Sequence, residues 1–102
     1  MRLFADQKIK EFCKRHPAAR AAAMHWERAI RVKNFANYNH LRQFFRSADY
    51  VSPYTIFNLG GNQYRIIAVI NFAQSTVRIL WVFTHPEYDK WSRQYLKGKV
   101  KR

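Results

Sequence analysis

Two arginines of this chain are suited to chemistry on a phosphate. Arg65 and Arg78 each stand in a segment whose other residues are mostly apolar. An arginine is always ionised, so in such a segment it needs a carboxylate, solvent at a sheet face, or a phosphate. The chain has only 6 Asp and Glu against 19 Lys and Arg. A phosphate site and a structural ion pair therefore both remain open for these arginines.

His85 and Tyr88 lie in a short polar segment that follows an apolar run. Thr84 and Glu87 have the spacing of a capping box, which predicts that a helix begins at this segment. A helix N-terminus disfavours positive charge, so a neutral His85 imidazole could accept a proton there. The alternatives are a first-turn histidine without a role and, for Tyr88, a packing contact.

Positive charge and aromatic rings are concentrated toward the C-terminus. Cations that neutralise phosphates, next to rings that stack on unpaired bases, are what binding of a single-stranded nucleic acid requires. The alternative is a solvated helix face whose rings pack on the sheet. The predicted RNA-binding cations are Lys90, Arg93, Lys97, Lys99, Lys101 and Arg102, and the neighbouring rings are Tyr88, Trp91 and Tyr95.

A metal site, a phosphate-binding loop and a cysteine nucleophile are poorly supported. His16, His25 and His40 have neither metal-ligand spacing nor a neighbouring carboxylate motif. Gly60-Gly61-Asn62 lacks the helix and lysine of a P-loop, so its glycines are predicted to serve a turn with positive φ. Cys13, the only cysteine, falls on the apolar stripe of a predicted helix. We therefore expect no metal ion and no cofactor.

Composition and charge limit the class of protein. The chain has 102 residues, is 48% hydrophobic and 17% aromatic, and carries a formal charge of +13. It is too apolar for a disordered segment and predicts one small domain over residues 1–102. The charge favours a polyanionic partner, and the single cysteine fits the reducing cytoplasm. No apolar run approaches the roughly 18 residues of a membrane span, so no membrane partner is expected.

Three helices are predicted before residue 52, each from an apolar stripe at helical spacing. A short strand at residues 2–5 precedes the first helix, for which Asp6 is placed as a cap. The second helix is the longest. The stripes consist of Ile9, Phe12 and Cys13, then of Ala22, Trp26, Ala29 and Ile30, and then of Leu41, Phe44 and Phe45.

Three strands are predicted at residues 54–59, 63–72 and 76–83, which form an antiparallel meander. Both alternating sets of the middle strand are apolar, so it should be central with both faces covered. A C-terminal helix should run to about Leu96, followed by a flexible basic tail over about residues 97–102. The fold class is α+β, with N-terminal helices packed on a small antiparallel sheet and a C-terminal helix.

Three segments of the chain, taken in order, resemble the motifs of one family. They are Ser47-Ala48-Asp49-Tyr50-Val51, Phe57-Asn58-Leu59-Gly60-Gly61-Asn62-Gln63-Tyr64-Arg65-Ile66 and Thr84-His85-Pro86-Glu87-Tyr88-Asp89-Lys90. Together they resemble HigB-type toxins of the RelE superfamily, from bacterial type II toxin–antitoxin systems. The resemblance implies a RelE-like fold and a metal-independent, ribosome-dependent mRNA endonuclease that acts in the ribosomal A site and inhibits translation. It also implies a helix-turn-helix antitoxin of the HigA type as the partner.

The chemistry that this resemblance implies is attack of a ribose 2′-OH on its own 3′ phosphate. Arg65 and Arg78 would then stabilise the charge of the phosphorane, and His85 would act as general base or general acid. Tyr88 and Lys90 would orient the RNA or the proton transfer. A positioned acid or base typically contributes about 10² to 10⁴-fold, and preorganised cations about as much or more.

Two other classes of function stay open from the sequence. A non-catalytic basic RNA-binding or ribosome-associated protein would need only the basic aromatic surface, and His85 would then be incidental. An antitoxin or DNA-binding regulator is disfavoured because the C-terminal half is rich in strands and the chain lacks a recognition-helix pattern.

Overall fold

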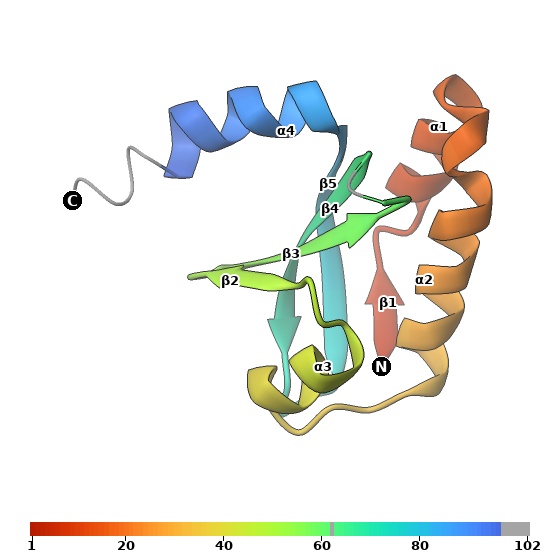
Figure 1. Ribbon diagram of the computed structural model, residues 1–102. Helices are drawn as coiled ribbons and strands as arrows, with labels where there is room; N and C mark the ends of the chain where they lie inside the picture. The colour runs from red at the N-terminus through yellow and green to blue at the C-terminus, as the bar shows by residue number, and fades with distance from the viewer. Residues whose placement is uncertain (62, 97–102) are drawn as a thin grey trace.

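A computed structural model of the chain describes residues 1–61 and 63–96. The predicted basic tail, residues 97–102, therefore lies outside the described residues. The elements in chain order are β1 (Arg2–Phe4), α1 (Gln7–Arg15), a 3₁₀ turn (Pro17–Ala19), α2 (Arg20–Val32), α3 (Tyr38–Phe44), β2 (Asp49–Val51), β3 (Tyr54–Leu59), β4 (Tyr64–Asn71), β5 (Thr76–Thr84), α4 (His85–Trp91) and a π-helical turn (Ser92–Leu96). The predicted α+β class is confirmed (Figure 1).

The five strands form one mixed sheet in the order β1-β5-β4-β3-β2. Neighbouring strands from β2 to β5 are antiparallel, and β4 is central, as predicted. The edge strand β1 pairs in parallel with β5, so the sheet is mixed rather than purely antiparallel. This pairing joins segments about 70 residues apart in the chain, and local sequence patterns carry no signal for it.

Helices cover the two faces of the sheet unequally. Figure 1 shows α1 and α2 along one side, with α4 extending over the other side from the end of β5. Ile66 and Ala68 of β4 belong to the core beneath α1, α2 and α3, whereas Ile67 belongs to a smaller cluster with Trp91 of α4. The face beneath α4 is therefore the more open of the two, and it carries both predicted arginines.

The predicted apolar stripes of α1 and α2 are buried, as expected from their spacing, except that Ala22 of α2 is only partly buried. Trp26 is 2% exposed, and its ring lies 5.2 Å from the ring of Phe57 on β3. Asp6 precedes α1 but its side chain makes no capping hydrogen bond. The Asp6 carboxylate instead accepts from Nη2 of Arg31 at 3.2 Å, which ties the start of α1 to α2.

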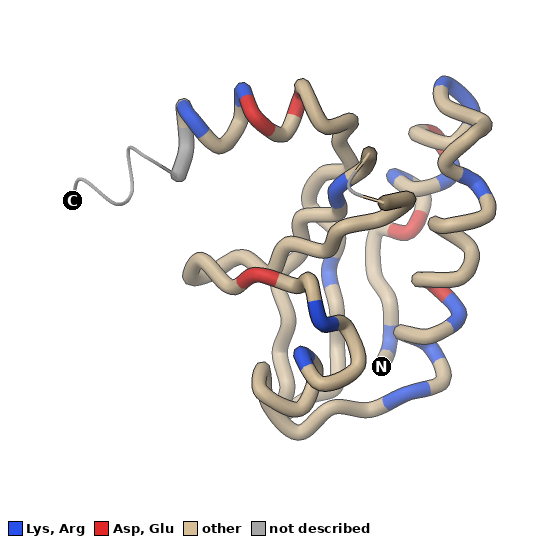
Figure 2. Tube along the Cα trace, in the orientation of Figure 1, with Lys and Arg blue, Asp and Glu red and all other residues tan. Residues whose placement is uncertain are grey.

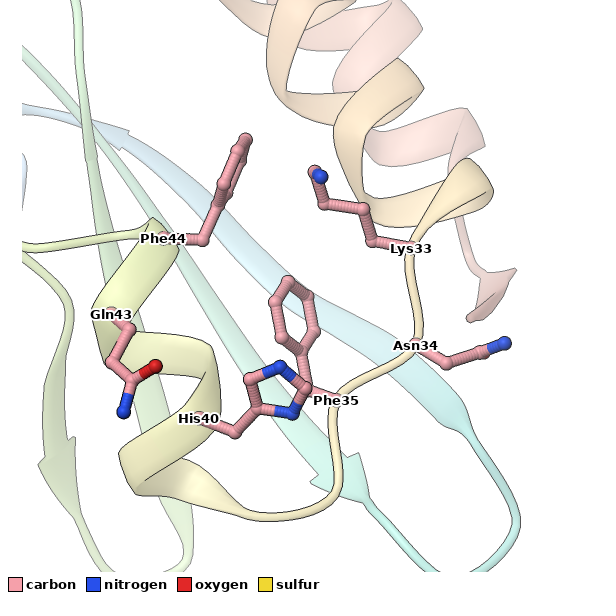
Figure 3. Close-up of a pocket in the computed structure, with 6 residues that line it drawn as sticks. All are labelled: Lys33, Asn34, Phe35, His40, Gln43 and Phe44. Carbon is pink, nitrogen blue, oxygen red and sulfur yellow. The ribbon is translucent and has the colours of Figure 1, made fainter.

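The short helix α3 begins after Asn37, whose side chain accepts from the backbone N–H of His40 at 2.9 Å. Leu41 is fully buried, but Phe44, the last residue of α3, is 45% exposed. The Phe44 ring lines a pocket of about 330 Å³ between the end of α2 and α3, where Nζ of Lys33 lies 4.5 Å from the ring centre (Figure 3). The predicted stripe therefore covers the core only in part.

Candidate active site

The end of β5 passes directly into α4. The Thr84 hydroxyl accepts from the backbone N–H of Glu87 at 3.4 Å, and the Glu87 carboxylate accepts from the backbone N–H of Thr84 at 2.8 Å. The predicted capping box is thus confirmed. The backbone N–H of His85 donates to the carbonyl of Gln63 at 2.9 Å. His85, the first residue of α4, is therefore fixed at the end of the sheet, beside the turn between β3 and β4.

That turn contains two glycines with positive φ, as predicted. Gly60 has φ +57° and Gly61 has φ +60°. A Cβ at Gly60 would lie 3.1 Å from the ring of Tyr64, so space as well as conformation favours glycine there. The turn directs the chain into the first residues of β4, which include Arg65, at the same end of the sheet as α4.

Arg65 is only 8% exposed. Its guanidinium carbon lies 5.1 Å from the centre of the Tyr88 ring, and Nη1 donates to the carbonyl of Tyr64 at 3.2 Å. A guanidinium keeps its charge even where it is buried, and stacking on a ring fixes the plane of its donors. The start of β4 therefore holds a positive charge of fixed orientation against α4.

His85 lies half-exposed on α4 and contacts a carboxylate one helical turn away. Its Nδ1 lies 3.0 Å from Oδ2 of Asp89, and both side chains are nearly half exposed. A carboxylate at Nδ1 orients an imidazole so that Nε2 is presented to a ligand. Residues three apart on a helix are neighbours, so Tyr88 lies beside His85.

Burial raises the pKa of the Tyr88 phenol above its usual value. The positive charge of Arg65 opposes this rise, Asp49 adds to it, a hydrogen bond with Ser92 opposes it, and Asp89 adds to it. Burial dominates, so Tyr88 carries its proton at neutral pH. The phenol is thus able to donate a hydrogen bond or a proton at the position where it contacts Arg65.

Two neighbours of this cluster were not predicted from the sequence. Asp49 on β2 acts electrostatically on Tyr88, and Asn58 on β3 stands opposite Arg65 in the sheet. The Asn58 amide donates to the carbonyl of Ser47 at 3.3 Å. β2 has only three residues, which is too short for a strand signal, although Asp49 and Asn58 both lie in segments that resemble the family motifs.

Arg78 lies far from Arg65 on the same face of the sheet. It stands opposite Val69 on β4, four residues from Arg65, which is ~13 Å at about 3.3 Å per residue. Arg78 is exposed, and its guanidinium lies 5.4 Å from the ring centre of Phe4 on β1. This separation follows from hairpin geometry, because the start of one antiparallel strand lies beside the end of the next. The two predicted arginines therefore occupy separate positions.

The predicted RNA-binding cations are described only in part. Lys90 and Arg93 are exposed on α4 and on the turn that follows it. Figure 2 shows acidic segments near the start of α4 and basic segments further along it. The side chain of Tyr95 and the remaining cations lie outside the described residues; these cations are Lys97, Lys99, Lys101 and Arg102.

Trp91 packs on the sheet, which was one of the two alternatives for the C-terminal rings. It is 7% exposed and its ring lies 5.5 Å from both Tyr54 and Trp81. Its burial anchors α4 on the sheet and leaves no face of the indole for a base. Tyr88 contacts Trp91 at 6.0 Å, so the same packing positions the phenol.

Other reactive groups of the described residues lie apart from this cluster. No three His, Cys, Asp or Glu side chains within residues 1–61 and 63–96 gather closely enough to hold a metal ion. Cys13 is buried, and burial raises the pKa of its thiol, which makes it a poor nucleophile. No helix in the described part of the chain has the length and apolar character needed to cross a membrane.

The chemical capacity of the cluster follows from its groups. Arg65 supplies a fixed positive charge, Tyr88 a protonated phenol, and His85 an imidazole oriented by Asp89. Charge stabilisation together with two proton-transfer groups is what phosphodiester transfer through a phosphorane requires. The fold and this cluster define a small, basic α+β protein of the RelE-like type with a candidate active site at one end of its sheet.

The chain matches the HigB toxin family, described as the RelE-like toxic component of a toxin–antitoxin system, over residues 19–91. It belongs to this family. It is also 28% identical to the mRNA interferase HigB of Escherichia coli O6:H1, over 97% of this chain and 99% of that protein. The mRNA interferase toxin HigB of Escherichia coli K12 and the mRNA interferase HigB of Shigella flexneri show the same identity and coverage. The resemblance in the sequence motifs is thereby confirmed.

Proposed function

We propose that this protein is an mRNA interferase that cleaves RNA by attack of a ribose 2′-OH on the adjacent 3′ phosphate. The observation that carries the proposal is the meeting of Arg65, Tyr88 and His85 at one end of the sheet. Membership of a family of toxic components and the names of full-length relatives support it. The products of this reaction are a 2′,3′-cyclic phosphate and a 5′-hydroxyl end.

Proton transfer divides between two side chains of α4. His85 takes the proton of the 2′-OH on Nε2 while Asp89 holds Nδ1. Tyr88, which carries its proton at neutral pH, gives that proton to the leaving 5′ oxygen. The phenolate then regains a proton from solvent, and the His85 imidazolium releases its proton to solvent, which restores both groups. This assignment follows from the protonation state, because a phenol that is protonated at neutral pH can donate a proton but cannot accept one as a base.

Arg65 stabilises the negative charge that develops on the phosphorane oxygens. Its guanidinium is already oriented by the Tyr88 ring, so little reorganisation is needed when the charge develops. Lys90 and Arg93 are exposed on the same C-terminal helical segment and contact the RNA backbone, together with the predicted cations of residues 97–102.

The proposed setting is the ribosomal A site in the cytoplasm, with mRNA as the substrate. Cleavage there needs no metal ion from the protein and inhibits translation. A helix-turn-helix antitoxin of the HigA type is the proposed neutralising partner. Ribosome dependence is tested by incubating purified protein with one mRNA, free or bound to ribosomes, in the same buffer. We expect cleavage only of the ribosome-bound mRNA. Equal cleavage of free and ribosome-bound mRNA would overturn the proposed ribosome dependence.

The experiment that tests the proposed function is induction of the protein in bacterial cells with mapping of mRNA 5′ ends. We expect wild-type protein and a matched control, His25→Ala on the exposed surface of α2, to produce new 5′-hydroxyl ends. His85→Ala should produce few or none. Growth inhibition without new ends in the wild type would favour a non-catalytic RNA-binding protein.

A further inference from the structure

The far end of the open sheet face contains a second basic site. A pocket of about 520 Å³ is lined by Arg2, Phe4, Gln74, Thr76 and Arg78. The guanidinium carbons of Arg2 and Arg78 lie 5.2 Å and 5.4 Å from the centre of the single Phe4 ring. β1 and β5 place these residues together, because Arg2 stands opposite Thr76 and Phe4 opposite Arg78. We call this set of five residues the Arg2–Arg78 site.

The two guanidinium groups of this site are not neutralised by the part of the chain that the structure describes. The ion pairs found there join Arg31 to Asp6 and Glu27, and His85 to Asp89. Two like charges sharing one ring repel each other, so their proximity favours an anion between or above them. The chain's formal charge of +13 increases this preference.

The donors around the pocket match a phosphate. A guanidinium stacked on a ring keeps its in-plane N–H groups available for paired hydrogen bonds to two phosphate oxygens. The Thr76 hydroxyl and the Gln74 amide add neutral donors, and no carboxylate lines the pocket. The turn that carries Gln74 is held by its backbone N–H, which donates to the Asn71 side chain at 3.0 Å. A phosphodiester in this pocket would therefore be next to hydrogen-bond donors and to no negatively charged side chain.

We propose that the Arg2–Arg78 site binds a phosphodiester group of RNA, separate from the one that is cleaved. That the ligand is RNA rests on the proposed function; the phosphate chemistry rests on the site itself. The distance from Arg65 to Arg78 along β4, ~13 Å, equals about four stacked nucleotides at 3.4 Å each, and fewer if the strand is extended. The phosphodiester belongs either to the mRNA strand that continues from the cleavage site or to ribosomal RNA.

Two double variants with the same loss of charge test this site. Arg2→Ala with Arg78→Ala removes both guanidinium groups, and Arg20→Ala with Arg28→Ala removes two exposed arginines from α2 on the other side of the sheet. Binding to a labelled 12-nucleotide single-stranded RNA and to ribosomes without mRNA is measured across a salt series. Thermal melts confirm folding, and Arg2→Gln with Arg78→Gln replaces the alanine pair if that pair melts early.

The site variant should bind roughly tenfold more weakly than the control variant, with a log–log salt slope shallower by about 0.7, because one neutralised phosphate is lost. If the site variant loses affinity for the 12-nucleotide RNA, the phosphate belongs to mRNA. If it loses affinity only for ribosomes without mRNA, the phosphate belongs to ribosomal RNA. Equal affinity and slope for the two double variants overturns the site. A wild-type protein that binds neither RNA nor ribosomes overturns the proposed function as well, so the two failures are distinguishable.

Discussion

Two arginines on one sheet face, one toward each end, differ in burial, and this difference underlies the two uses that we propose for them. Arg65 is 8% exposed and stacks on Tyr88, whose ring carries an ionisable hydroxyl. Arg78 is exposed and stacks on Phe4, which also holds Arg2. A buried charge beside proton-transfer groups suits chemistry, because it is preorganised and shielded from water. An exposed pair of charges on an inert ring suits binding of a phosphate that is not cleaved.

The largest expected effect comes from a substitution in the hydrophobic core, which supports the sheet beneath both Arg65 and Arg78. Trp26→Ala should lower the free energy of unfolding by about 3 to 5 kcal/mol, because it removes a ring that is 2% exposed and packs on Phe57 beneath the sheet. The variant should lose both cleavage and phosphate binding through unfolding. Urea denaturation measures the change in stability.

Trp26→Phe is the control for that variant. The indole Nε1 of Trp26 has no hydrogen-bond partner in the described residues, so phenylalanine keeps most of the packing and loses no hydrogen bond. Trp26→Phe should lower the free energy of unfolding much less than Trp26→Ala does. A Trp26→Ala protein that unfolds at the same urea concentration as wild type would show that α2 does not support the sheet in this way.

The next effect distinguishes the two arginines directly. Arg65→Lys keeps the charge but loses the planar fork, and should reduce single-turnover cleavage on programmed ribosomes by about 10² to 10³-fold. Arg78→Lys is the matched control and should change the cleavage rate constant far less, because Arg78 lies ~13 Å along the sheet from Arg65. Equal losses in the two variants would contradict the division of roles between them.

The smallest expected effect comes from the raised pKa of Tyr88. Phe4, the ring beside Arg78, has no ionisable group. In the unfolded chain a tyrosine has a pKa of about 10, whereas burial raises the pKa of native Tyr88 above that value. Above that pH the unfolded state binds fewer protons than the native state, so the free energy of unfolding falls as pH rises. Tyr88→Phe lacks this contribution and should lose less stability between pH 8 and pH 10.5.

The difference between Tyr88→Phe and wild type should be about 1 kcal/mol or less. Urea denaturation of both proteins at the two pH values measures it. The same pH dependence in both proteins would show that Tyr88 titrates alike in the native and unfolded states.

Local patterns predicted much of the fold. The capping box at Thr84 and Glu87, the positive φ of Gly60 and Gly61, and the central position of β4 each depend on neighbouring residues or simple alternation. The parallel pairing of β1 with β5 and the three-residue strand β2 were not predicted. The first depends on contacts between distant segments, and the second is too short to show a period.

The sequence indicated candidate site residues one by one but not their arrangement. The sequence singled out Arg65, His85 and Tyr88, and motif resemblance gave them roles. The stacking of Arg65 on Tyr88 depends on how Trp91 anchors α4 on the sheet, which no spacing rule reveals. The electrostatic effect of Asp49 on Tyr88 depends likewise on the position of β2.

The central claim is that His85 and Tyr88 transfer protons at the end of the sheet that holds Arg65. Single-turnover cleavage on programmed ribosomes, measured for His85→Ala, Tyr88→Phe and the double variant beside thermal melts, tests it most directly. Each single variant should cleave about 10² to 10⁴-fold more slowly, and the double variant should lose less than the product of the two. His85 is exposed, so its variant should change stability by about 1 kcal/mol or less. Variants that fold and cleave like wild type would contradict the claim and leave a protein that binds RNA without cutting it.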